Sequence, residues 1–117
     1  DMVGRLGDQP LTIQGLDTAE EFPDWMEQIA ERTNLKFKNK PGGAGPSDHA
    51  SFFEKEIPVM HFFSGLHRDY HRPTDDLDKI DIEGLEKVTN TVTQVTLKIA
   101  NAESRPTFQS KGQASKK

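Results

Sequence analysis

The sequence predicts an α/β domain in which a mixed β-sheet is flanked by helices in three layers. Short β-rich runs alternate with longer segments of helical spacing, in the order strand, strand, helix, strand, helix, strand, helix. One run, residues 57–63, is continuously apolar and bounded by turn residues, which is typical of a strand buried on both faces. The 117 residues have the length of at most one domain.

The first expected strands lie near the start of the chain. Residues 2–6 read as the end of a strand, and residues 11–13 alternate as a second short strand. The turn-forming residues 7–10 separate the two segments, which can therefore pair as a hairpin. A further short strand is expected at residues 35–37.

The first helix is expected to end near Thr33. Thr18 followed by Glu21 resembles a capping box, and Pro23 suits the first helical turn. The apolar residues behind this prediction recur at helical spacing: Phe22, Trp25, Met26, Ile29 and Ala30.

Two more helices follow a Gly- and Pro-rich loop at residues 40–46. Ser47 is a suitable N-cap for a short helix, and Asp81 for a long amphipathic one. The long helix is marked by Ile82, Leu85, Val88, Val92, Val95 and Ile99. We therefore expect the domain to cover residues 1–101, and the polar residues 102–117 to form a disordered tail or a linker to a further domain.

Composition excludes several classes of function. The net charge of −4 argues against a nucleic-acid partner, which would need a basic face. The chain has no cysteine, so a metal must be held by nitrogen and oxygen ligands. No apolar run approaches the length of a membrane span. Because the chain opens with Asp1 on an apolar pattern, we expect it to be a piece of a longer protein.

All four histidines lie between His49 and His71, beside several aspartates. Histidine is the commonest metal ligand and titrates near neutral pH, so this concentration predicts a metal or acid/base site. His71 follows the apolar run in a polar loop, where α/β enzymes gather ligands, although a surface histidine is the simpler interpretation. His61 is expected to be a neutral, hydrogen-bonded core residue, and His67 a structural or supporting one.

Two aspartates have two interpretations each. Asp48 stands at a helix start, where a carboxylate is favoured electrostatically, and either caps the helix or acts in catalysis. Asp1 is either a terminal residue or, in a fragment, a carboxylate presented to a site from the end of a strand. The residues alone leave both questions open.

Three segments together resemble a known family: DMVGRL at 1–6, SDHASFFEKEIPVMHFF at 47–63 and GLHRDYHRPTDDLDKID at 65–81. They are similar to the C-terminal half of the co-catalytic zinc exopeptidases of the bacterial leucine aminopeptidase type, with glutamate carboxypeptidase and glutaminyl cyclase as relatives. The resemblance covers roughly residues 1–101. It implies a mixed-sheet α/β domain that binds two zinc ions, acts on peptides, and is periplasmic or secreted.

The resemblance also implies roles for individual residues. Asp1 would ligate one zinc and His71 the other, while the Tyr70 hydroxyl would hydrogen-bond the scissile carbonyl oxygen. Asp48 would lie near the site, where its role varies among relatives. These roles suit the chemistry, because zinc activates a water and a phenol stabilises an oxyanion. Phe62 and Phe63 either line the substrate pocket or pack in the core.

The sequence departs from the family pattern in what it lacks. The upstream His-x-Asp, the bridging Asp and the Glu-Glu pair that includes the general base cannot be placed; Glu20-Glu21 comes in the wrong order, and Asp76 replaces a common Thr. We therefore expect an aminopeptidase whose 117 residues alone are inactive. The alternatives are a non-catalytic interaction domain of the same fold, or carboxypeptidase or glutaminyl cyclase chemistry. An arginine-rich pocket for a free carboxylate would favour a carboxypeptidase, and Arg68 and Arg72 leave that alternative open.

Overall fold

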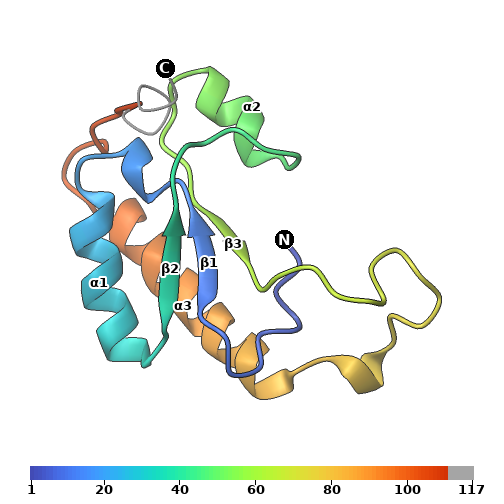
Figure 1. Cartoon of the computed structure of the whole chain (residues 1–117). Coiled ribbons are helices and arrows are strands. Elements are labelled where there is room, and N and C mark those ends of the chain that lie inside the picture. Colours follow the sequence, from blue (N-terminus) through green and yellow to red (C-terminus); the bar gives the residue numbers. More distant parts are fainter. Residues whose placement is uncertain (111–117) are drawn as a thin grey trace.

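A computed structural model of the chain describes residues 1–110 (Figure 1). Three short strands, three α-helices and two 3-10 turns make up this part of the chain. In order they are β1 (Leu11–Gln14), η1 (Leu16–Thr18), α1 (Phe22–Thr33), β2 (Phe37–Lys40), α2 (His49–Glu54), β3 (His61–Phe63), η2 (Leu77–Lys79) and α3 (Ile82–Ala100). The predicted α/β class with a mixed sheet is confirmed.

The sheet has the order β2-β1-β3, with β1 in the centre. β1 pairs with β2 in parallel, Leu11 opposite Phe37, and with β3 in antiparallel, Ile13 opposite Phe62. Because side chains alternate across a strand, this register places Ile13 and Phe62 on one face of the sheet. Thr12 lies on the other face.

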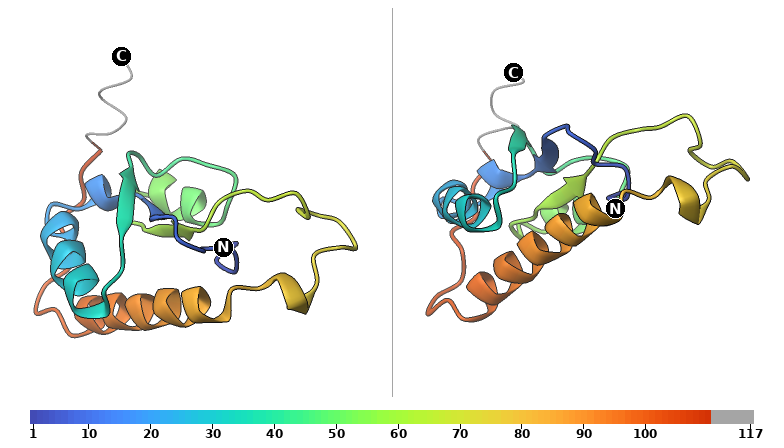
Figure 2. Two further views of the ribbon diagram at one scale, coloured as in Figure 1. Left: turned by 60° about the horizontal axis from the view of Figure 1, so that its bottom comes forward. Right: turned by 90° about the horizontal axis from the view of Figure 1, so that it is seen from below.

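The core lies on the face that carries Leu11 and Ile13, both fully buried. Helices α1 and α3 lie together against this face (Figure 2). Their inward side chains complete one cluster, which includes Phe22, Met26, Ile29, Val88 and Val95. The helical spacing in the sequence therefore identified the residues that bury this side of the sheet.

The second face of the sheet carries polar and aromatic side chains. At one end of this face lie Gln14 and His61, which are paired across β1 and β3. The Gln14 side-chain amide donates a hydrogen bond to the Ala44 carbonyl, and the His49 ring at the start of α2 stacks on His61 at 4.5 Å between centroids. Helix α2 and the loop before it thus supply the third layer, over one end of this face (Figure 1).

Three of the predicted strands were wrong in position or extent. Residues 2–6 form no strand and no hairpin, because Met2 has a left-handed backbone (φ 57°) and its carbonyl accepts hydrogen bonds from Ser64. The run 57–63 contributes only His61–Phe63, at an edge of the sheet and half-buried, because β1 offers it just three partners before Gly15 turns away (φ 95°). The most buried strand is β1. The expected strand at 35–37 lies two residues later, as β2.

All three predicted helices are present, and α1 ends at Thr33 as expected, but of the predicted caps only that of α3 is found. The Asp81 side chain accepts a hydrogen bond from the Gly84 N–H, so the predicted cap of α3 is confirmed. The capping box before α1 is absent: the Thr18 hydroxyl bonds the backbone of Val59 and the Glu21 carboxylate accepts from the Thr107 N–H. Both groups are used by distant segments instead.

The segment after α3 returns to the domain. The Glu20 N–H donates to the Thr107 carbonyl, the Gln109 N–H to the Thr18 carbonyl, and Phe108 lies 5.6 Å from Phe53 between ring centroids. The predicted tail therefore contacts the domain as far as Gln109, and the expectation for residues 111–117 lies outside the described residues. Within residues 1–110, no helix is long and apolar enough to cross a bilayer.

Candidate active site

Three of the four predicted site residues border one cavity. Asp1, Tyr70 and His71 line a cavity of about 270 Å³. In sequence, all three strands of the sheet lie between Asp1 and Tyr70. The remaining walls include Arg5, Ser64, His67, Asp75 and Ile80. The cavity is formed where the segment 1–7 meets the long loop 64–76.

Tyr70 and His71 form a stacked pair at the turn of this loop. Their ring centroids are 3.8 Å apart with planes 19° from parallel, and 42% of Tyr70 is exposed. His71 has a left-handed backbone (φ 55°), which a non-glycine residue adopts only when its surroundings enforce it. The Tyr70 N–H donates to the His67 carbonyl and closes this turn. Both rings are thus presented together at the cavity.

The segment that carries Asp1 is held from two sides. The Met2 carbonyl accepts hydrogen bonds from the Ser64 N–H at 2.9 Å and from the Ser64 hydroxyl at 2.7 Å. The Gly4 carbonyl accepts from the Asp81 N–H at 2.8 Å. The segment is therefore fixed between the end of β3 and the start of α3, although it belongs to no strand.

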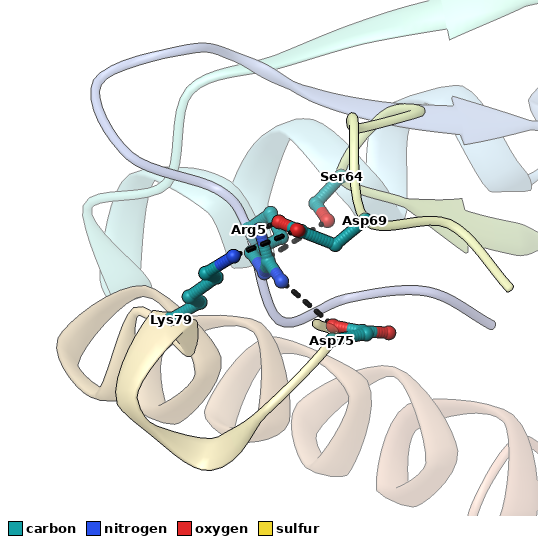
Figure 3. A network of polar contacts seen from close by, with 5 residues as sticks. All are labelled: Arg5, Ser64, Asp69, Asp75 and Lys79. Atoms are coloured by element: carbon teal, nitrogen blue, oxygen red, sulfur yellow. Dashed lines mark hydrogen bonds and ion pairs between the residues drawn. The ribbon is translucent and has the colours of Figure 1, made fainter. Parts of the chain in front are cut away.

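Arg5 joins this segment to the loop (Figure 3). Its guanidinium contacts the Asp69 carboxylate at 3.2 Å and the Asp75 carboxylate at 2.6 Å. The backbone N–H of Arg5 donates to the Ser64 hydroxyl, and the Lys79 ammonium donates to the second carboxylate oxygen of Asp69 at 2.7 Å. Arg5 was not among the predicted site residues, because its partners lie far along the chain.

These contacts lower the pKa of Asp69 well below its usual range. The largest cause is the hydrogen bond from Lys79, followed by one from Thr74, and the contact with Arg5 acts in the same direction against the opposing effect of burial. Asp69 is therefore an ionised carboxylate that accepts from two cations. It stabilises the loop immediately before Tyr70.

A second cavity of about 270 Å³ lies beside the first, over the second face of the sheet. Asp1 and Tyr70 border both cavities, and Phe63 and Leu66 form an apolar part of the wall of the second cavity. Phe62, by contrast, packs against the core. Of the two phenylalanines considered for a pocket, only Phe63 has that position.

The floor of the second cavity contains the stacked pair His49 and His61. Burial, and then the neighbouring His49, lower the pKa of His61 to about 4, and burial also lowers the pKa of His49. His61 is therefore neutral at pH 7, as predicted. The predicted hydrogen bonding is wrong at Nε2 of His61, which is buried without a partner.

The remaining candidate residues lie elsewhere. Asp48 precedes α2 and makes no side-chain capping bond, and neither cavity has it in its wall. Its catalytic role stays a prediction. Arg68 and Arg72 line a separate cavity with Asp69 and Lys79, and neither lines the cavity of Asp1 and His71. His67 lines the first cavity, and its Nδ1 is buried without a partner.

The comparison with family models decides the family. The model of peptidase family M28 matches residues 1–96. The chain belongs to peptidase family M28. The resemblance inferred from the three sequence segments is thereby confirmed.

A solved structure supports the fold of this M28 chain. The LapA aminopeptidase of Legionella pneumophila matches 89% of the chain with a TM-score of 0.72 and 18% sequence identity. The M28 chain spans about 30% of the LapA chain. No curated protein matches the chain.

The donors at the first cavity fit part of a zinc site. Zinc takes carboxylate oxygens and imidazole nitrogens, which Asp1 and His71 supply at one cavity. Catalytic zinc usually has three protein ligands, however, and residues 1–110 contain no group of three or more histidines or acids that could hold a metal. Asp1 and His71 are therefore donors of the right kind for zinc, but the described residues bring no complete ligand set together around them.

Proposed function

We propose that this chain contributes Asp1, Tyr70 and His71 to the active site of a zinc-dependent M28 aminopeptidase. The observation that carries the proposal is the single cavity bordered by all three residues. Membership of the family supports peptidase chemistry, and the neighbouring aminopeptidase fold supports this subclass. The incomplete ligand set supports a site that is completed by residues outside 1–110.

Each residue has a role that its chemistry allows. The Asp1 carboxylate and the His71 imidazole each hold one of two zinc ions. When bound, zinc supplies an activated water and polarises the carbonyl of the peptide. The exposed Tyr70 hydroxyl donates a hydrogen bond to the carbonyl oxygen as negative charge develops on it. Stacking on His71 keeps the phenol beside the metal ligand.

The second cavity suits the side chain of the substrate's first residue. It adjoins the first cavity through Asp1 and Tyr70, and Phe63 and Leu66 give it apolar walls. A peptide whose scissile carbonyl lies at Tyr70 can therefore place its N-terminal side chain there. Asp48, which lies near the second cavity only through its neighbours Ser47 and His49, is proposed as a supporting catalytic residue on the family resemblance alone.

The test uses the gene product that contains this chain, with zinc content and aminopeptidase activity measured together. His71→Ala removes a ligand, so we expect loss of bound zinc and at least a 100-fold loss of kcat/KM, about the upper end of losses seen for supporting residues. Tyr70→Phe should keep the zinc and lose about 100- to 1000-fold in kcat. Arg68→Ala, which removes an exposed side chain of the same loop outside this cavity, is the matched control and should retain both zinc and most activity.

Two results would contradict these assignments. A folded wild-type protein that binds no zinc and releases no N-terminal residue would overturn the proposal. It would leave a non-catalytic member of the family, in which the cavity serves binding. Equal losses in Arg68→Ala and His71→Ala would instead contradict the assignment of His71.

A further inference from the structure

Arg5 is placed between the two parts of the site. It lies on the same segment as Asp1, and its guanidinium binds Asp69 and Asp75, which flank the Tyr70–His71 pair on either side in sequence. A single side chain therefore ties the segment that presents one proposed ligand to both sides of the turn that presents the other (Figure 3).

The loop has few other ties. Among the described residues, every side-chain hydrogen bond from residues 65–76 to the rest of the chain ends on Arg5 or Lys79. Most side chains of this loop are exposed, so apolar packing does not fix it. The position of Tyr70 and His71 consequently depends on these charged contacts.

The chemistry of the tie requires arginine. Two carboxylates approach one guanidinium, one at Nη1 and one at Nη2, and the side chain of Arg5 is only 18% exposed. A guanidinium donates in a fixed planar fork, whereas a lysine ammonium is a point charge on a flexible stem. Without the guanidinium, Asp75 has no cation among the described residues and Asp69 keeps only Lys79.

We propose that Arg5 is a positioning residue that fixes the Tyr70–His71 turn relative to Asp1, and so sets the spacing of the two proposed zinc ligands. The proposal rests on the proposed function for the identity of those ligands. It gives Arg5 no contact with substrate. The effect of Arg5 on catalysis passes entirely through the geometry of the turn.

The first experiment is amide hydrogen exchange on the metal-free gene product, which requires neither zinc nor activity. Arg5→Met should accelerate exchange at the hydrogen-bonded N–H groups of Tyr70, Arg72 and Asp75 by at least about tenfold, since charged hydrogen bonds are lost. Exchange in α3 should not change. Arg32→Met removes an exposed arginine of α1 and is the matched control, with no change at either place.

The second experiment measures zinc affinity and steady-state kinetics on the same variants. Arg5→Met should weaken zinc binding or lower kcat by about 10- to 100-fold, as for other residues that orient metal ligands, with a smaller change in KM. Arg5→Lys keeps the charge without the fork and should fall between Arg5→Met and wild type. If Arg5→Met does not fold, Arg5→Lys and Lys79→Met decide; Lys79→Met should have the smallest effect because Lys79 contacts Asp69 alone.

The outcomes separate this proposal from the proposed function. Unchanged loop exchange in Arg5→Met, with zinc affinity and kcat equal to those of Arg32→Met, would overturn the role of Arg5 while the aminopeptidase stands. Faster loop exchange in a protein that binds no zinc and hydrolyses nothing would leave Arg5 fixing the turn but would overturn the catalytic purpose given to it. A uniform rise in exchange across α3 and the loop would also overturn it, by showing a general loss of stability.

Discussion

The two faces of the sheet differ in how their side chains are stabilised. On the core face, Leu11, Ile13 and Phe62 meet apolar residues of α1 and α3, and the packing involves many interchangeable contacts. On the second face, Gln14 and His49 are buried and His61 is half-buried through a few directional contacts, and Nε2 of His61 has no hydrogen-bond partner. Burial thus stabilises one face directly, whereas on the other it has an electrostatic cost.

The core face therefore stabilises the fold, whereas the second face lies under the cavities proposed for catalysis. The cavities lie over the second face and its adjoining loop, where buried polar groups without partners are tolerated. Unsatisfied groups of this kind cost free energy and are found where function requires them. Substitutions on the two faces should therefore differ in both size and dependence on conditions.

The largest effect is expected on the core face. Ile13→Ala should lower the free energy of unfolding by about 2–5 kcal/mol, because Ile13 is fully buried between the helices and the sheet. Thr12→Ala, the next residue of the same strand but on the other face, should cost about 1 kcal/mol or less. Urea unfolding of both variants checks the pair, and equal losses would contradict the division between the faces.

A second effect is expected where β1 ends. Gly15 has a φ of 95°, and a Cβ there would collide with the Val59 carbonyl oxygen. Gly15→Ala should therefore cost more than the roughly 1–2 kcal/mol of a left-handed alanine. Gly7→Ala is the control, since Gly7 also has a positive φ of 56° but no atom near a Cβ, and should cost only that amount. Thermal unfolding compares the two, and a larger loss at Gly7 would be inconsistent with this geometry.

The smallest effect is a dependence on pH that belongs to the second face. The pKa of His61 is lowered from 6.5 to about 4, chiefly by burial, so the unfolded chain binds more protons than the folded chain between these values. Stability is therefore unaffected above pH 6.5 and should fall as the pH falls from 6.5 towards 4. His61→Phe should reduce this slope in urea titrations at pH 7.5 and 5. His49 leaves a residual slope, and an identical slope in wild type and variant would contradict the prediction.

The core face could be predicted from sequence because its signals are local. The periodic residues Phe22, Met26 and Val88 are buried where the helical spacing placed them, and Asp81 caps α3 as expected. Extent was harder to predict. The run from Ile57 onwards is apolar enough for a long strand, but β1 offers it only three partner residues. The sequence of the run does not reveal how long its partner strand is.

The site could be predicted only in part. The family resemblance placed Asp1, Tyr70 and His71, and the structure brings them to one cavity. Arg5 was missed because its partners Asp69 and Asp75 are 64 and 70 residues away, so no local pattern connects them. The only available signal was an arginine in an otherwise apolar segment, opposite a loop rich in aspartate.

The hydrogen bonds between Met2 and Ser64 have a consequence for the order in which the molecule is made. They join residues 62 positions apart, and the partner of Gly4 is later still, at Asp81. Residues 1–7 leave the ribosome before any of these partners exist. At roughly 5–20 residues per second, they wait several seconds in an unpaired state. During that interval the segment is open to chaperones and proteases.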